Sequence, residues 1–346
     1  MKLHRTPAAV LALAIVVALS ASACGRSSKS SASGGSGGKI GIDFPRSDSD
    51  FWNSYAKYVN ADVKSGSINA LNPTNSDNKI DNLVANVQTL QGQGAKAIIM
   101  APQDTGAIAN TLENLSAQHI PVVSVDTRPD KGQVYMVVRA DNKAYGTKAC
   151  DFLGQKLQNK GTVVEFEGDL TSINGRDRSQ AFGDCMSSKY PGIKVLAEAT
   201  NWDGPTAVAK LQDALNQGTV NGVYMQAGGV YLAPTLSLLQ QKNLLVPPTD
   251  PKHIFVVSND GIPAEYQAIK SGQIDATVSQ PADLYAKYAL FYAQAALAGK
   301  TFSPGPTDHG STIIQIPNGL EDQLPAPLVT AADVNDPSLW GNQVGK

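Results

Sequence analysis

The sequence predicts an α/β protein with parallel sheets, divided into two domains that follow an N-terminal leader. Short apolar strands alternate with amphipathic helical segments from Lys39 onward, and such regular alternation indicates βαβ units with parallel strands. The chain has 346 residues, and the part after the leader, roughly 300 residues long, favours two domains over one.

The first residues have the layout of an export signal. Lys2, His4 and Arg5 supply positive charge, an apolar run occupies residues 8–19, and small residues stand just before Cys24. The apolar run is too short to span a bilayer comfortably as a permanent helix, and this order of parts is that of a signal peptide. We therefore expect residues 1–23 to be a signal peptide.

The segment around Cys24 resembles the bacterial lipobox, in which the cysteine thiol receives a diacylglyceryl group and becomes the new N-terminus. Residues 25–38 are almost wholly Gly, Ser and Ala, a composition that cannot bury enough apolar surface to fold. We expect residues 24–38 to be a lipidated flexible tether that holds the exported body on the outer face of the cytoplasmic membrane. The alternative is an ordinary signal peptide cleaved after Ala23, with Cys24 unmodified.

The body of the chain divides into alternating strands and helices. Ile80, Leu83, Val87 and Leu90, for example, fall on one face of a helix. We expect strands at 39–44, 68–71, 95–101, 121–126, 162–167, 194–199, 222–226, 253–258 and 276–279. We expect helices at roughly 51–63, 80–90, 105–117, 143–157, 176–188, 205–216, 231–242, 263–271 and 281–298.

Polar and aromatic side chains gather directly after these strands, where open parallel sheets bind their ligands. Carboxylates, amides and guanidinium groups make directed hydrogen bonds to hydroxyls, and flat aromatic faces cover the C–H faces of a sugar ring. The loops therefore predict a site for a sugar-like solute. Their polar and aromatic residues include Ser49, Phe51, Trp52, Asp126, Thr127, Asn174, Arg176, Arg178, Trp202, Asp260 and Gln280.

Charge and motifs argue against several other classes of protein. The formal net charge of −2 is not basic enough for nucleic-acid binding. The sequence contains no G-x-S-x-G, H-E-x-x-H or P-loop motif, so we do not expect an enzyme. The acidic residues Asp43, Asp48 and Asp50 lack the spacing of a calcium loop, and we expect neither a metal nor a cofactor.

Two cysteines remain in the body once Cys24 is set aside. Cys150 and Cys185 both fall on predicted helices early in the same domain. Cysteines of an exported protein can pair in a disulfide, and two buried free thiols are the alternative.

A series of short motifs then occurs in a fixed order and spacing. They are Phe51-Trp52, Val122-Val123-Ser124-Val125-Asp126, Ala140-Asp141-Asn142, Gly175-Arg176-Asp177-Arg178, Val256-Val257-Ser258-Asn259-Asp260-Gly261 and Ala276-Thr277-Val278-Ser279-Gln280. In these motifs the chain, from about residue 39 to residue 300, resembles the ribose-binding-protein family of type I periplasmic binding proteins.

The resemblance implies two Rossmann-like lobes with parallel sheets, joined by a hinge of three crossings. The crossings would fall near residues 140–142, near Gln280 and around residues 308–310. The implied lobes are 39–140 plus 281–309, and 141–280 plus 310–346.

The resemblance also implies roles for the site residues. Stacking falls to Phe51, Trp52 and Trp202, polar contacts fall to Asp126, Arg176, Asp260 and Gln280, and further candidates are Ser49, Thr127 and Gln226. The family often has Asn-Asp where this chain has Ala227-Gly228, and Asn where it has Ser49. These differences argue against ribose itself, and another pentose, a hexose, a polyol or an oligosaccharide fits as well.

The function implied by the resemblance is that of an extracytoplasmic lipoprotein, acting as a monomer, that captures a sugar or polyol and delivers it to an ABC transporter permease. A receptor that passes the signal of the bound solute to a membrane sensor is the alternative. Sugar-responsive repressors share the two-lobe fold but carry a basic DNA-binding headpiece, where this chain has its leader. The segment 318–346 extends beyond the resemblance, and Trp340 within it is expected to be a packing anchor.

Overall fold

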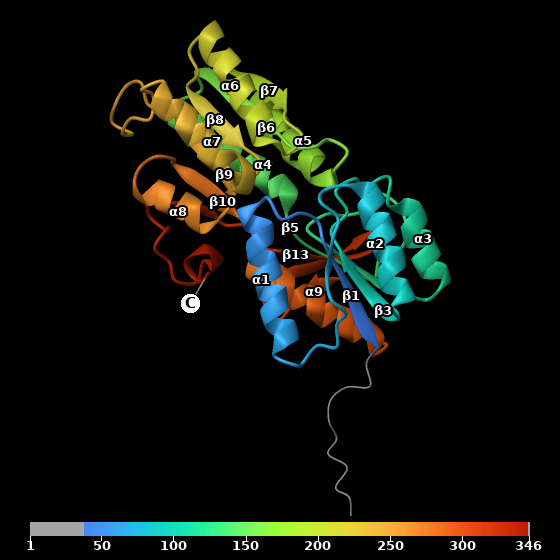
Figure 1. Cartoon of the computed structure of the whole chain (residues 1–346). Coiled ribbons are helices and arrows are strands. Elements are labelled where there is room, and N and C mark those ends of the chain that lie inside the picture. Colours follow the sequence, from blue (N-terminus) through green and yellow to red (C-terminus); the bar gives the residue numbers. More distant parts are fainter. Residues whose placement is uncertain (1–37, 345–346) are drawn as a thin grey trace, which may run out of the picture. The chain divides into compact units, whose positions relative to one another are not determined.

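The first of two sheets is mostly parallel and forms the centre of one lobe (Figure 1). This computed structural model describes residues 38–344, so the predicted signal peptide and the lipidation at Cys24 lie outside the described residues. In spatial order the strands are β11 (Gly305–Pro306), β12 (Thr312–Ile316), β13 (Gly319–Leu324), β5 (Met136–Ala140), β4 (Val122–Val125), β3 (Ala95–Met100), β1 (Lys39–Phe44) and β2 (Thr74–Asn75).

The second sheet is parallel apart from one antiparallel edge strand. Its strands, again in spatial order, are β14 (Leu328–Thr330), β10 (Ala276–Ser279), β9 (Phe255–Asp260), β8 (Gly222–Met225), β6 (Gly161–Glu167) and β7 (Ile193–Ala199). The two mostly parallel sheets confirm the predicted fold class.

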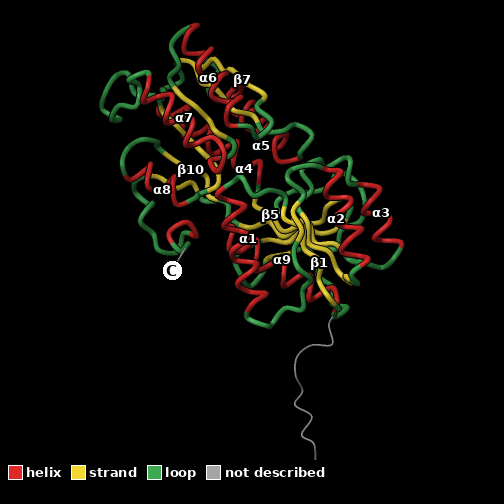
Figure 2. Tube along the Cα trace, in the orientation of Figure 1, coloured by secondary structure: helices red, strands yellow, loops and turns green. Residues whose placement is uncertain are grey.

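Helices cover both faces of each sheet, as Figure 2 shows. The first sheet is covered by α1 (Asp50–Lys64) and α9 (Ala282–Leu297), and by α2 (Ile80–Gly92) and α3 (Ala109–Ala117). Those packed on the second are α4 (Asn142–Lys156) and α5 (Ile173–Lys189), and α6 (Gly204–Gln217), α7 (Gly228–Gln241) and α8 (Pro263–Lys270).

The two-sided cover explains why the strands are near-continuous apolar runs. Along β3, Ala97 and Ile99 pack in the cluster with α1 and α9, whereas Ile98 and Met100 pack in the cluster with α2 and α3. This alternation follows from the two-residue period of a strand. It leaves the carboxyl ends of the strands, rather than their faces, as the place for polar residues.

Several strands differ from the expected pattern. The predicted strand at 68–71 is reduced to one bridge between Ile40 and Ala70, and the edge strand β2 lies after it. Strand β5 was not expected, because its run of buried apolar residues is interrupted by the charged Arg139. Arg139 is nevertheless buried, since it pairs with Asp177 and Glu321.

The third crossing between the sheets is not at residues 308–310, as expected, but at residues 325–327. The chain runs from β13 in the first sheet to β14 in the second, because β13 pairs in parallel with β5. Residues 310–324 therefore belong to the first lobe and not to the second. Their apolar side chains Ile313, Ile316 and Leu324 are buried in the first lobe's cores.

Two further features bear on the sequence predictions. Cys150 of α4 and Cys185 of α5 are joined in a disulfide, which ties together two helices on the same face of the second sheet. Within the described part of the chain, no helix has both the length and the apolar character needed to cross a membrane.

Candidate functional site

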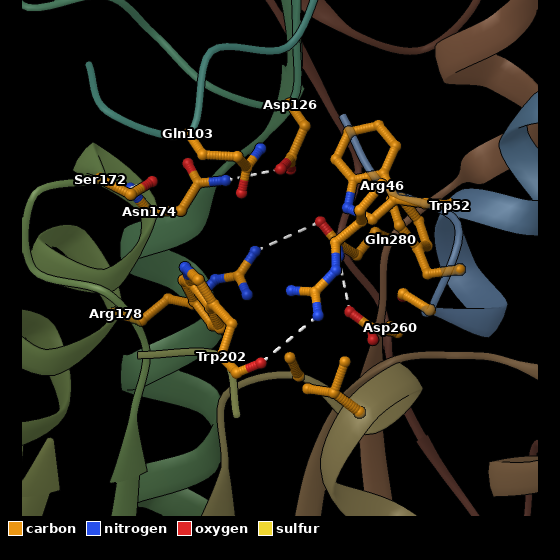
Figure 3. A pocket seen from close by; sticks show the side chains of 14 residues that line it. Arg46, Trp52, Gln103, Asp126, Ser172, Asn174, Arg178, Trp202, Asp260 and Gln280 are labelled. Atoms are coloured by element: carbon orange, nitrogen blue, oxygen red, sulfur yellow. Dashed lines mark hydrogen bonds between the residues drawn. The ribbon is translucent and has the colours of Figure 1, made fainter. Parts of the chain in front are cut away.

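A cavity of about 420 Å³, partly open to solvent, lies where the carboxyl ends of strands from the two sheets meet (Figure 3). This volume includes the space that is open to solvent. Both lobes supply its lining residues, which are Arg46, Ser49, Phe51, Trp52, Gln103, Asp126, Ser172, Asn174, Arg178, Trp202, Ala227, Val230, Asp260 and Gln280.

The aromatic wall of the first lobe comes from the start of α1. Strand β1 ends at Phe44, and the chain turns before Asp50, so Phe51 and Trp52 reach the cavity from the first helical turn. Their rings meet edge to face at 5.2 Å, and Phe51 meets Tyr285 and Trp340 in the same manner. The predicted pair therefore lies at the cavity and is held in place by other aromatic rings behind it.

Asp126 follows β4 and is held in an unusual backbone conformation with φ of +62°. Its Oδ2 accepts a hydrogen bond from Asn174 Nδ2 at 2.7 Å, across to the second lobe, and its Oδ1 accepts from the Tyr285 hydroxyl at 3.4 Å. Burial raises the pKa of Asp126, although the guanidinium groups of Arg178 and Arg139 act in the opposite direction.

The arginine that α5 supplies to the cavity is Arg178 and not the predicted Arg176. Helix α5 starts at Ile173 after the N-cap Ser172, so Asn174 and Arg178 share a face four residues apart, and Arg176 points elsewhere. Arg176 instead donates to Asp130 Oδ1 at 2.6 Å and to Thr105 Oγ1 at 3.2 Å, at the edge of the lobes.

Arg178 is buried and donates to three neutral acceptors. Its Nε donates to Asn142 Oδ1 at 2.6 Å, its Nη1 to the Gln226 carbonyl at 2.5 Å, and its Nη2 to Gln280 Oε1 at 3.3 Å. Its guanidinium also lies 4.8 Å from the ring centre of Tyr145 and 5.7 Å from that of Trp202. These contacts fix a planar hydrogen-bond donor at the wall of the cavity.

Trp202 lies at the cavity, as expected, on a strained loop. Asn201 and Trp202 both have positive φ, +52° and +57°, and the ring lies against Gly168, where a Cβ atom would come within 1.9 Å of it. Gly168 is therefore needed to seat this ring. Among the described residues, none accepts a hydrogen bond from the buried Trp202 Nε1.

Asp260 and Gln280 form one linked unit in the second lobe. Asp260 Oδ1 accepts from Gln280 Nε2 at 2.6 Å, and Oδ2 accepts from the Gly229 backbone amide at 2.7 Å. Burial raises the pKa of Asp260 to about 6. The neighbouring Glu265, also buried with a raised pKa, accepts from the amides of Gly261 and Ile262.

Two other predicted residues do not reach the cavity. Thr127 is buried, and its backbone carbonyl accepts from Ser124 Oγ, because the left-handed turn at Asp126 directs the next residue inward. Gln226 Nε2 donates to Glu165 and Ser179, and its Oε1 accepts from the Gly168 amide. Gln226 therefore supports the loop under Trp202 instead of facing a solute.

Sequence reasoning placed Asn174 and Arg178 in a strand-end loop without giving them a role, and it did not name Arg46 or Gln103, which also line the cavity. The helical period relates Asn174 to Arg178, and Gln103 follows the end of β3, where strand-end residues are expected at the site. Arg46 had the same signal, because it stands two residues after the end of β1 at Phe44.

The cavity combines guanidinium, carboxylate, amide, hydroxyl and indole groups, which suits a solute with many hydroxyls. Its described lining contains no histidine, cysteine or lysine. In residues 38–344, the cluster with the geometry of metal ligands is Cys150, Asp151 and Cys185, and its two sulfurs are already bonded to each other.

Comparison with known proteins gives consistent results. The model of a family described as the periplasmic binding protein domain matches residues 40–301. The ribose import binding protein RbsB of Haemophilus influenzae is 26% identical over 218 residues, which is 63% of this chain and 71% of that protein. The xylitol-binding protein of Mycolicibacterium smegmatis is 26% identical over 256 residues, which is 73% of this chain and 68% of that protein.

Solved structures share the fold. A solute-binding protein from Bacillus halodurans with bound myo-inositol has a TM-score of 0.75 at 19% identity, covering 90% of this chain and 99% of the other. A solute-binding protein from Mycobacterium smegmatis with bound glycerol has a TM-score of 0.73 at 23% identity, covering 86% and 96%.

Proposed function

Because this chain belongs to the periplasmic binding protein domain family, we propose that it captures a sugar or polyol in its interlobe cavity and delivers it to the permease of an ABC importer. The family match makes the chain an extracytoplasmic binding protein and not an enzyme. The proposal covers the ligand, the residues that hold it, the membrane anchor and the partner.

The observation that carries the proposal is the make-up of the cavity. Trp52 and Trp202 come from different lobes, and Asp126, Arg178 and Asp260 stand between them. A solute with several hydroxyls could satisfy these polar groups while the indoles cover its C–H surface. Relatives named for ribose and xylitol support the same class of ligand.

Ala227 and Val230 line the cavity at the start of α7, and neither side chain has a hydrogen-bonding group. A solute that fits here presents fewer polar groups on that side. This supports a ligand other than ribose.

Capture would proceed by hinge closure about the three crossings. A solute favours the closed form only by the additional contacts it makes there. Residues of both lobes line the same small cavity, which supports this mechanism.

A thermal-shift screen of pentoses, hexoses, polyols and disaccharides tests the ligand class, because a bound solute raises the unfolding temperature by mass action. We expect at least one neutral sugar or polyol to raise it and to change tryptophan emission, since Trp52 and Trp202 both line the cavity. If no member of the panel does either, the proposed ligand class is wrong.

We further propose that the protein is a monomer tethered by lipid on Cys24 after removal of residues 1–23. Radiolabelled palmitate should label the wild type in cells and should not label Cys24→Ala. Labelling of both proteins, or of neither, would contradict the anchor at this residue.

A further inference from the structure

Arg46 lies in the loop between β1 and α1 and lines the cavity, with a side chain only 10% exposed. We propose that Arg46 reads the bound solute directly, by donating hydrogen bonds from Nη1 to an oxygen of an uncharged polyol or sugar. This inference rests on the proposed function and names the charge class of its ligand.

The guanidinium of Arg46 is anchored on one edge. Nε donates to Asp48 Oδ1 at 2.5 Å and Nη2 to Asp48 Oδ2 at 2.9 Å. Nη2 also approaches the Trp202 carbonyl of the second lobe at 3.5 Å. Figure 3 shows the group directed into the cavity toward that carbonyl. The two-point ion pair fixes the plane of the guanidinium, as bidentate pairs do.

The Nη1 group of the guanidinium is unused. Among the described residues none accepts a hydrogen bond from Nη1 of Arg46. Nη1 carries two N–H groups, and it is not among the fully buried atoms that lack a partner, so a solute that enters the cavity can reach it. An oxygen of a bound solute would supply the missing acceptor.

The adjoining wall at the start of α7 lacks a donor of this kind. Ala227 and Val230 of the α7 region offer no side-chain donor. The glycine at position 229 lets the loop of Arg46 approach α7, because a Cβ there would come within 2.6 Å of Ser49 Oγ and 3.3 Å of the Phe51 amide nitrogen. The donor that this wall lacks therefore comes from the loop that packs against it.

The ion pair with Asp48 sets the charge class of the ligand. The guanidinium brings a positive charge to the cavity edge, and the Asp48 carboxylate, whose pKa Arg46 lowers, balances it. A hydroxyl or ring oxygen gains the directed hydrogen bonds of Nη1, whereas a carboxylate of a sugar acid gains little net attraction. Arg46 with Asp48 should therefore favour neutral solutes over acidic ones.

The test compares variants on a panel of neutral sugars and polyols with sugar acids such as gluconate and glucuronate, by calorimetric titration. Arg46→Ala should lower affinity for the best neutral solute at least tenfold and change the ranking of the panel. Arg46→Gln, which retains one amide donor, should lose less. Asp48→Asn should raise affinity for the acids relative to the neutral solutes several-fold.

Arg176→Ala is the matched control, because it also removes an arginine that pairs with an aspartate between the lobes but does not line the cavity. It should change all affinities by a common factor of threefold or less and keep the ranking. Unfolding midpoints near the wild-type value verify that each variant is folded.

The outcomes separate the two proposals. If the wild type binds neutral solutes and Arg46→Ala binds them with the same affinities and ranking, the role of Arg46 is wrong and the proposed function stands. If the wild type binds no neutral solute, the proposed function fails and the inference fails with it. Preference of the wild type for sugar acids would contradict the assigned charge class alone.

Discussion

Helix α5 carries one arginine at the wall of the cavity and another at the outer edge of the lobes, and the surroundings of the two differ. Arg178 and Arg176 stand two residues apart on α5, yet Arg178 is 2% exposed and bonded to neutral acceptors, whereas the Arg176 side chain is 36% exposed and paired with Asp130. A buried cation must be satisfied by its surroundings, and an exposed pair is screened by solvent. The comparison indicates that the burial of an arginine, more than the distance between charges, decides how much its contacts contribute to stability.

A further set of hydrogen bonds and ion pairs, also involving α5, joins the two lobes. Asn174 donates to Asp126 and accepts from Arg139, and Arg139 also pairs with Asp177. These contacts are buried, so they belong with the cavity wall and not with the edge.

The largest effect is expected for Arg178→Ala. The change leaves three acceptors without their donor and removes the cation that lowers the pKa values of Asp126 and Asp260. We expect a loss of about 3–5 kcal/mol in the free energy of unfolding, measured by denaturant titration, together with loss of solute binding.

Arg178→Lys is the matched variant. It keeps the charge but has no planar fork that could reach all three acceptors, so it should fall between the wild type and Arg178→Ala. If Arg178→Ala were as stable as the wild type, the buried contacts at the cavity wall would contribute no more stability than the exposed pair at the edge.

The next effect concerns Asp126. Asp126→Ala should weaken binding of the best solute from the screen by about 2–3 kcal/mol, because buried donors lose their acceptor. Thr127→Val is the control. It removes an unpartnered hydroxyl of the adjacent residue, which does not line the cavity, and it should bind as the wild type does. Equal losses in both variants would contradict the distinction drawn between these neighbours.

Asp260 gives a pH test of the wall. Burial raises its pKa from 3.8 to about 6, so the folded chain holds this proton more tightly than the unfolded chain. The corresponding stability is present below about pH 4 and is lost as the pH rises through about 6.

Asp260→Asn cannot ionise, so its stability relative to the wild type should rise between pH 4.5 and pH 7.5, by on the order of 1–3 kcal/mol. Denaturant titrations of ligand-free protein at the two pH values measure this change. A constant difference between the two proteins would contradict the raised pKa.

The smallest effect is expected at the edge. Arg176→Ala or Asp130→Ala should cost no more than about 1 kcal/mol in the free energy of unfolding, and less at high salt. The charge swap Arg176→Asp with Asp130→Arg should restore part of the loss. Lys210→Ala is the control within the second lobe, since Lys210 pairs there with Glu198 at similar exposure. A loss above about 2 kcal/mol in the free energy of unfolding for either variant would contradict the expectation that the exposed pair contributes little.

The order of strands and helices could be predicted because periodicity is local. Strands β1 and β10 occupy the residues expected from their apolar runs. The later hairpin, β12 and β13, was missed, because Glu321 and Asp322 make it polar although both are buried through partners distant in sequence, among them Arg139, Tyr292 and His309.

Positions at the cavity could be predicted where strand ends alone decide them, as for Asp126, Trp202 and Asp260. The prediction was wrong where a local detail of the backbone, such as the start of a helix, decides the direction of a side chain. A helix that begins three residues earlier than expected turns Arg176 out and Arg178 in. Such a shift has no signature in composition.

The C-terminal segment has a practical consequence for protein production. The family match ends at residue 301, yet three strands of the first sheet and the last crossing follow it. The Trp340 indole then packs on Phe51 at 6.0 Å and donates to the Asp260 carbonyl at 3.1 Å. An expression clone cut at residue 301 would remove these contacts at the back of the cavity, so clones and reporter fusions should retain the chain through residue 344.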